Sequence, residues 1–192
     1  WGVVGTRPSG TSDADQSLFA DADFITLLEE SSYGAQAVDF IAVDYNHASS
    51  SPDYLRVNRD VGADTHRTEF EQGVEIMDGY EPFTWEANDV VDVWDTFLTS
   101  GVPYFFREYH STVSGFDSGI YLMGSADGDY YQSRNDLLGF GNSRAMNEGG
   151  EWFTYTPIAT DWYGFVVLGN EDNAASSGSL WMGRQETLTS DS

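Results

Sequence analysis

The chain of 192 residues contains no cysteine and no lysine. Without cysteine it can form neither a disulfide nor a thiolate metal site, and it cannot use a cysteine nucleophile. All eight basic residues are arginines, set against 32 aspartates and glutamates, so the formal net charge is −24. A surface this acidic repels phosphate backbones and anionic lipids. Nucleic acids and membrane surfaces are therefore poor partners, whereas cations and neutral or basic polymers remain.

The sequence also lacks long apolar segments. No run approaches the ~20 residues of a membrane-spanning helix, so no membrane insertion is expected. The start shows no charged segment followed by an apolar core, as a signal peptide would. Because the chain opens at Trp1 rather than methionine, we expect a processed or excised product. Processing favours export, to the extracellular space or the cell surface.

An excess of negative charge lowers the stability of the folded state, and the size of this effect depends on the salt concentration. Self-repulsion at −24 destabilises the compact state, and about 1 M salt screens it within roughly 3 Å. A saline habitat or bound divalent cations would relieve it. A halophilic source and an ordinary acidic secreted protein are the two interpretations.

The composition and the apolar pattern predict an all-β protein. Hydrophobic residues make up 40% and aromatic residues 15% of the chain, as in folded globular domains. Short alternating runs are separated by clusters of Gly, Asp, Asn and Ser about every ten residues, which is typical of antiparallel strands. Only residues 23–32 compete as a short helix. We expect antiparallel, jelly-roll-like β-sandwiches.

An internal repeat is visible as well. Residues 14–31 can be laid over residues 116–133 without a gap. Both segments hold an Asp, an aliphatic and aromatic pair, an acidic turn and a closing Ser. Further along, the matches are Phe40 with Phe153, Tyr54 and Val57 with Tyr163 and Val166, and Phe70 with Trp181. The repeat predicts two tandem sandwich domains, at residues 1–78 and 79–192.

The order of these motifs resembles the bacterial pre-peptidase C-terminal domain family, a β-sandwich appended to secreted peptidases and other surface proteins. The resembling residues are Asp15, Leu18, Phe19, Ser31, Phe40, Tyr54 and Val57, and again Asp117, Ile120, Tyr121, Ser133, Phe153, Tyr163 and Val166. The resemblance implies two tandem copies of that fold covering most of the chain.

The two copies differ at their beginnings. Residues 90–104 look like the opening strand of the family, and the first copy has no such segment. The first copy should therefore present an unpaired sheet edge or an open groove into its core. An upstream segment, or a strand donated by another molecule, would fill that gap.

No pattern of catalytic residues emerges. The three histidines, His47, His66 and His110, show no metal-ligand spacing. Residues 115–119, GFDSG, do not place a Ser centrally before a helix, as a nucleophile elbow requires. Adjacent acid pairs carry little information in a chain with 32 acids. We therefore expect a protein that is not an enzyme.

Two acidic turns are candidates for calcium. Residues 20–23 and 125–129 place carboxylates at alternate positions of a tight turn, where oxygen ligands can converge on a hard cation. The candidate ligands are Asp21, Asp23, Asp127 and Asp129. Ordinary solvated turns are the other interpretation.

Aromatic side chains suggest a binding surface. Because Phe153 matches a core residue, alternation turns Trp152 outward. An exposed Trp152, with Tyr130 and Tyr131, would stack on sugar rings or plug a neighbouring subunit. Packing against the other domain is the alternative.

Two functions follow from these features. The first is a non-catalytic extracellular structural or adhesive protein that self-associates, such as a filament subunit completed by a neighbour's strand. The alternative is an accessory module of a secreted peptidase or glycosidase that binds an extracellular polymer through Trp152, Tyr130 and Tyr131.

Overall fold

The prediction of an all-β fold is confirmed. A computed structural model describes residues 1–9, 12–34, 37–45, 47, 51–62, 65–77, 79–86, 89–110, 117–136, 138–141, 150–169 and 176–184. These residues form sixteen strands and no helix. Among them there is no helix long and apolar enough to cross a membrane. The segment that competed as a helix forms a turn and a strand, β3 (Leu27–Ser31).

The strands make four sheets, which we name A to D. In order across the sheet, sheet A holds β12 (Tyr131–Ser133), β4 (Asp39–Val43), β1 (Gly2–Pro8) and β6 (His66–Gln72), and sheet B holds β3, β2 (Asp13–Phe19) and β5 (Tyr54–Val61). Sheet C holds β13 (Gly139–Gly141), β11 (Ser118–Gly124), β15 (Asp161–Gly169), β9 (Val91–Leu98) and β7 (Val74–Glu75). Sheet D holds β14 (Trp152–Tyr155), β10 (Tyr104–His110), β16 (Ser176–Arg184) and β8 (Gly79–Trp85). Neighbouring strands are antiparallel except β7 and β9.

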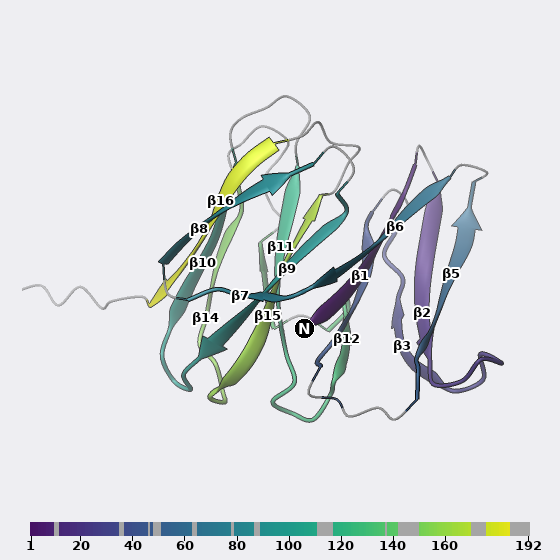
Figure 1. The fold of residues 1–192 in the computed structure, drawn as a ribbon, viewed down its shortest axis with the longest axis horizontal. Helices are drawn as coiled ribbons and strands as arrows, with labels where there is room; N and C mark the ends of the chain where they lie inside the picture. Colours follow the sequence, from purple (N-terminus) through teal and green to yellow (C-terminus); the bar gives the residue numbers. More distant parts are fainter. Residues whose placement is uncertain are drawn as a thin grey trace, which may run out of the picture.

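The four sheets stack as layers in the order D, C, A, B (Figure 1). Sheets C and D enclose one apolar cluster, which includes Trp85, Trp94 and Phe106. Sheets A and B enclose a smaller one, with Val4, Leu18 and Ile41. We call sheets A and B the first sandwich, and sheets C and D the second.

A third apolar cluster joins the two sandwiches. It brings Val3 and Phe40 of sheet A against Val93, Val166 and other residues of sheet C. Sheet C is therefore buried on both faces, which explains why β11 is buried at every position whereas β10 of the outer sheet D alternates. Strands buried on both sides have apolar side chains on both sides.

The N-terminus lies within this contact between sheets A and C. The Trp1 amino group is 2.6 Å from Asp95 Oδ1 in a buried ion pair. The Trp1 ring lies over Gly164, where an added Cβ would come within 2.8 Å of it. Gly164 is thus the residue in sheet C that leaves room for the indole.

Strand order repeats between the sandwiches. The succession β4, β1, β6 in sheet A parallels β14, β10, β16 in sheet D, and β3, β2, β5 in sheet B parallels β13, β11, β15 in sheet C. The second sandwich has β8 and β9 in addition, beyond β16 and β15.

Not every residue match from the sequence falls on the same face. Leu18 and Ile120 both face the interior of their sandwich. Phe153 does so too, but its match Phe40 faces sheet C, and Ile41 takes the interior position. Because a shift of one residue reverses the faces of a strand, this match is wrong by one position.

Strands also cross the predicted boundary. β12 follows residue 78 in the chain and pairs with β4 in sheet A, whereas β7 precedes residue 78 and pairs with β9 in sheet C. The division at residues 1–78 and 79–192 stays a prediction.

Candidate functional site

The first sandwich has two outermost strands on one side. β5 is the last strand of sheet B and β6 the last strand of sheet A, and no strand of the described part of the chain pairs with their outer edges. In the second sandwich the corresponding edges of β15 and β16 are covered by β9 and β8. Unpaired backbone N–H and C=O groups on such edges are ready to accept another strand.

An apolar hollow of about 240 Å³ lies between sheets A and B on this side. Phe70, from β6, is 73% exposed there. The hollow is lined by Gly2, Val3, Val4, Leu18, Ile41, Val43, Asp53, Leu55 and Phe70. All but Asp53 are apolar, so the hollow favours an apolar side chain over water.

The second sandwich shows what fills the corresponding space. β8 contributes Trp85, which is fully buried, and β9 contributes Trp94 and Leu98 to the same cluster. The Trp94 ring lies 5.8 Å from Phe83 and 6.5 Å from Phe165, centre to centre. We call β5, β6 and the hollow between them the open side of the first sandwich.

A second surface lies on the outer side of sheet D. The register places Trp152 of β14 opposite Arg107 of β10, Arg107 opposite Trp181 of β16, and Trp181 opposite Tyr80 of β8. Phe105, two residues before Arg107, stacks on Trp152 at 5.9 Å and meets Trp181 edge-on at 5.6 Å. We call these outward side chains of sheet D, together with Tyr109 and Ser179, the aromatic face.

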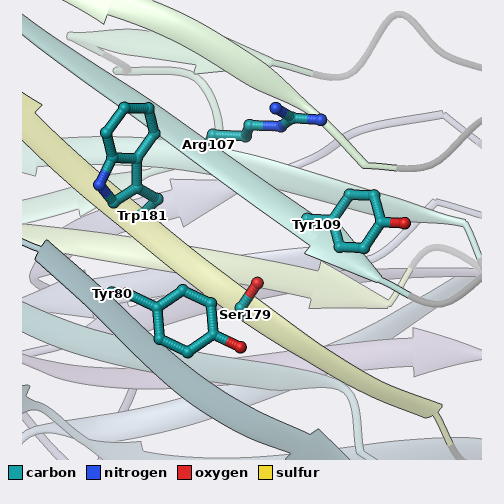
Figure 2. Close-up of a pocket in the computed structure, with 5 residues that line it drawn as sticks. All are labelled: Tyr80, Arg107, Tyr109, Ser179 and Trp181. Carbon is teal, nitrogen blue, oxygen red and sulfur yellow. The ribbon is translucent and has the colours of Figure 1, made fainter.

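A hollow of about 310 Å³ lies in the aromatic face. Figure 2 shows Ser179 between Tyr80 and Tyr109, with Trp181 and Arg107 beyond them. The Arg107 guanidinium carbon is 5.5 Å from the centre of the Tyr109 ring, within the range of a cation–π contact. Tyr80, Tyr109 and Trp181 are 68%, 49% and 48% exposed.

The three residues proposed for binding from the sequence do not lie together. Trp152 is 50% exposed on the aromatic face. Tyr130 and Tyr131 are in or beside β12 of sheet A, packed on His47. Tyr131 is only 9% exposed, and its hydroxyl donates to Asp53 Oδ2 at 3.2 Å. Sequence reasoning did not select the partners of Trp152, because they come from strands paired across long separations.

The first acidic turn is held by its own carboxylate. Asp21 Oδ1 accepts hydrogen bonds from the amides of Asp23 and Ile25, and Oδ2 accepts one from Thr26 at 2.7 Å. These backbone hydrogen bonds, those from Ile25 and Thr26 above all, lower the Asp21 pKa. Both oxygens of Asp21 therefore already serve the turn.

The second acidic turn contributes to a cluster of carboxylates. Asp127 Oδ1 accepts from the Asp129 amide, and Asp129 Oδ1 accepts from the Tyr131 amide. Oxygens of Glu29, Asp129 and Asp136 lie within 4.8 Å of one another. Burial raises the Glu29 pKa, and the charges of Asp136 and Asp129 add to this. Calcium binding by Asp21, Asp23, Asp127 or Asp129 stays a prediction.

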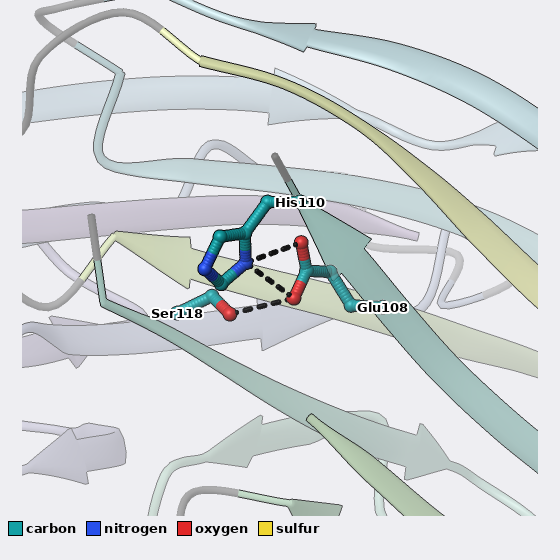
Figure 3. Close-up of polar contacts among 3 residues, drawn as sticks. All are labelled: Glu108, His110 and Ser118. Atoms are coloured by element: carbon teal, nitrogen blue, oxygen red, sulfur yellow. Dashed lines mark hydrogen bonds and ion pairs between the residues drawn. The ribbon is translucent and has the colours of Figure 1, made fainter. Parts of the chain in front are cut away.

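A buried polar group joins β10 to β11 (Figure 3). Glu108 accepts a hydrogen bond from Ser118 Oγ at 2.7 Å and lies 3.0 Å from His110 Nδ1. A relay for nucleophilic catalysis needs the hydroxyl bonded to the imidazole. Here the hydroxyl and the imidazole both bond to the carboxylate, and the three residues are at most 3% exposed. The arrangement is a structural tie between two sheets.

No family model matches the chain, and none of the curated proteins does. Among solved structures it is similar to the pre-peptidase C-terminal domain of a collagenase from Bacillus anthracis, at 14% identity and TM-score 0.44, over 58% of this chain and 95% of that one. It is similar to a surface-associated copper-binding protein from Methylomicrobium album BG8, at 11% identity and TM-score 0.41, over 60% of this chain and 100% of that one. It is also similar to a periplasmic inhibitor of g-type lysozyme from Salmonella Typhimurium, at 18% identity and TM-score 0.33, over 59% of this chain and 100% of that one. Likeness at this level carries no conclusion about function.

Proposed function

We propose that the protein is a non-catalytic structural or adhesive subunit at the cell surface or in an extracellular assembly, in which a strand from a neighbouring copy completes the first sandwich. The observation that carries this proposal is the open side of the first sandwich, where two outermost strands flank an apolar hollow.

In this proposal the two sandwiches are copies of one module divided near residue 78, with β12 and β7 as the strands that cross between them. The shared strand succession supports this. β9 then serves as the template for the missing strand, because it runs antiparallel to β15 along residues 91–98. A donated strand would run antiparallel to β5 in the same way.

Addition of a donated strand to the first sandwich has a clear energetic basis. Strand addition supplies backbone hydrogen bonds along an edge, and side chains at alternate positions enter the core. An aromatic side chain of the size of Trp94 buries roughly 150–250 Å², which corresponds to about 4–6 kcal/mol before the cost of ordering. The apolar lining of the hollow suits such a side chain.

The open side is less acidic than the rest of the chain. In β5 and β6, Arg56, Arg59 and Arg67 balance Asp60, Glu69 and Glu71, whereas the whole chain has a net charge of −24. Segments of this protein are acidic, as β9 is with Asp92 and Asp95. Repulsion between whole molecules opposes association at low salt, so association should strengthen near 1 M salt.

We predict that Leu55→Trp weakens self-association by about tenfold or more, since 1.4 kcal/mol corresponds to a factor of ten. Leu55 lines the hollow from β5, so an indole there occupies the space meant for the donated side chain. The measurement is sedimentation velocity over a concentration series in about 1 M NaCl. Asn58→Trp is the matched control, because alternation puts position 58 on the other face of β5.

The proposal fails if the wild-type protein remains monomeric at every concentration, or if Leu55→Trp associates as well as the wild type. A synthetic peptide with the β9 sequence, Val91–Leu98, separates the possible sources of the strand. A monomeric protein that binds this peptide, with the Leu55→Trp variant failing to bind it, would show that the open side accepts a strand but does not take it from a second copy.

We also propose that Glu29, Asp129 and Asp136 hold a calcium ion in this extracellular setting. Their oxygens converge within 4.8 Å, and a ligand that binds only the folded state stabilises it. Excess calcium should raise the melting temperature of the wild type but not of Asp136→Asn, with Asp161→Asn as the control. Equal responses of wild type and Asp136→Asn would mean that the cluster is simply solvated.

A further inference from the structure

The aromatic face differs in composition from the rest of the molecule. Its alternating outward positions hold five aromatic residues and one arginine, together with proline, glycine and small hydroxyl residues, and among the described side chains they hold no aspartate or glutamate. In the whole chain 32 of 192 residues are acidic. The six larger side chains are Tyr80, Phe105, Arg107, Tyr109, Trp152 and Trp181.

The aliphatic residues of sheet D lie on the opposite face. Leu180 and Met182 point into the cluster between sheets C and D, together with Phe106. None of the described outward side chains of sheet D is Leu, Ile, Val or Met. An exposed patch rich in large rings marks a binding surface, and a patch without Leu, Ile, Val or Met suits the C–H faces of hydroxylated rings better than the side chains of a protein core.

The rings hold one another in place before any ligand arrives. Trp152 lies nearly parallel to Phe105, at an interplanar angle of 25°, and Trp181 meets Phe105 edge-on at 62°. Trp152 and Trp181 are two strands apart, which is about 10 Å by the spacing of a sheet, a distance comparable to a disaccharide unit in an extended polysaccharide. Preorganised rings lose little entropy when they bind.

The hollow adds polar groups at the scale of one sugar ring. Its volume of about 310 Å³ is at the lower end of pockets for small ligands. Arg107 supplies N–H donors and Ser179 a hydroxyl beside the rings of Tyr80, Tyr109 and Trp181. Pyranose rings present C–H groups that stack on aromatic faces and hydroxyls that accept hydrogen bonds. The net charge of −24 repels sulfated, phosphorylated and uronate polymers.

We propose that the aromatic face binds a neutral polysaccharide chain, with one pyranose ring in the hollow beside Trp181 and the chain continuing over Phe105 toward Trp152. This site lies on sheet D, whereas the open side belongs to sheets A and B, so it goes beyond the assembly function and does not depend on it.

The test is retention on polysaccharides of defined chemistry. Binding of the full chain is measured by depletion on insoluble cellulose and chitin, and by affinity electrophoresis in mannan and mixed-linkage glucan, with alginate as the acidic comparison. At least one neutral polymer should retain the wild type. Trp181→Ala should weaken that binding about ten- to thirtyfold, as expected for a central aromatic anchor. Arg107→Ala should weaken it as well.

Phe97→Ala is the matched control, because Phe97 is 51% exposed and meets Trp162 edge-on on sheet C, away from the aromatic face. It should bind like the wild type, and all variants should keep the same melting temperature. Failure of every neutral polymer to retain the protein, or equal binding by Trp181→Ala, would overturn the proposal. Retention by alginate alone would overturn the neutral class. Loss of self-association in Trp181→Ala without any sugar binding would assign the face to a protein partner.

Discussion

Replacing Glu108 by alanine is expected to lower the free energy of unfolding by about 3–5 kcal/mol. The Glu108 carboxylate is fully buried and accepts hydrogen bonds from Ser118 Oγ and His110 Nδ1. Alanine would leave both donors in the interior without their acceptor, and a buried polar group that loses its partner bears the full cost of desolvation. Urea denaturation at 25 °C, followed by tryptophan fluorescence, measures the change.

Glu108→Gln separates the carboxylate from the shape of the side chain. The amide oxygen can still accept from one donor, so we expect a loss of about 1–3 kcal/mol. Equal stability of Glu108→Ala and the wild type would contradict a structural role for this group. That result would mean that the Glu108 side chain does not tie β10 to β11, although it accepts a hydrogen bond from Ser118 Oγ in the structure.

Stability is expected to fall as the pH rises from about 4 to about 7. Burial, together with the charges of Asp89, Glu71 and Glu69, raises the pKa of Asp92 to about 7. Below pH 4 Asp92 is protonated in the folded and the unfolded chain, so it contributes no difference. Between the two pKa values only the folded chain keeps the proton, and each rise in pH favours unfolding. Above pH 7 Asp92 is ionised in the folded chain too, and the full cost of its buried charge lowers the stability.

Asp92→Asn should remove most of this dependence. The amide resembles the protonated acid, so we expect a gain of about 1–3 kcal/mol at pH 8 that disappears near pH 4. Urea titrations at pH 4.5, 6 and 8 measure this gain in the free energy of unfolding. Asp127→Asn is the control, because it removes an equal charge from an exposed position. A gain of the same size at all three pH values would show that Asp92 does not retain its proton.

Alternation predicted much of the fold because it records which face of a strand meets the core. In β10 the pattern alternates, since one face of sheet D is exposed. In β11 it fails, since both faces are covered. The sequence therefore predicted strands and sandwich architecture, whereas the stacking of one sandwich on the other depends on contacts such as that between Phe40 and Tyr121 across sheets. No local pattern contains that contact.

The candidate surfaces show the same limit. Trp152 lies outward on the aromatic face, as alternation from Phe153 predicts. Its association with Trp181 and Tyr80 depends on the register of β10, β16 and β8, which joins residues far apart in the chain. Tyr131 belongs to a short strand whose pairing with β4 buries it, and its composition gives no sign of that pairing.

The pairing of β12 with β4 has a mechanical consequence. A strand from one half of the chain is a member of a sheet in the other half, and sheets A and C share a continuous apolar contact. The two sandwiches therefore cannot rotate relative to each other about a flexible linker. Any fibre built from this molecule would bend mainly at the junctions between subunits, and each four-layered block would behave as a rigid segment.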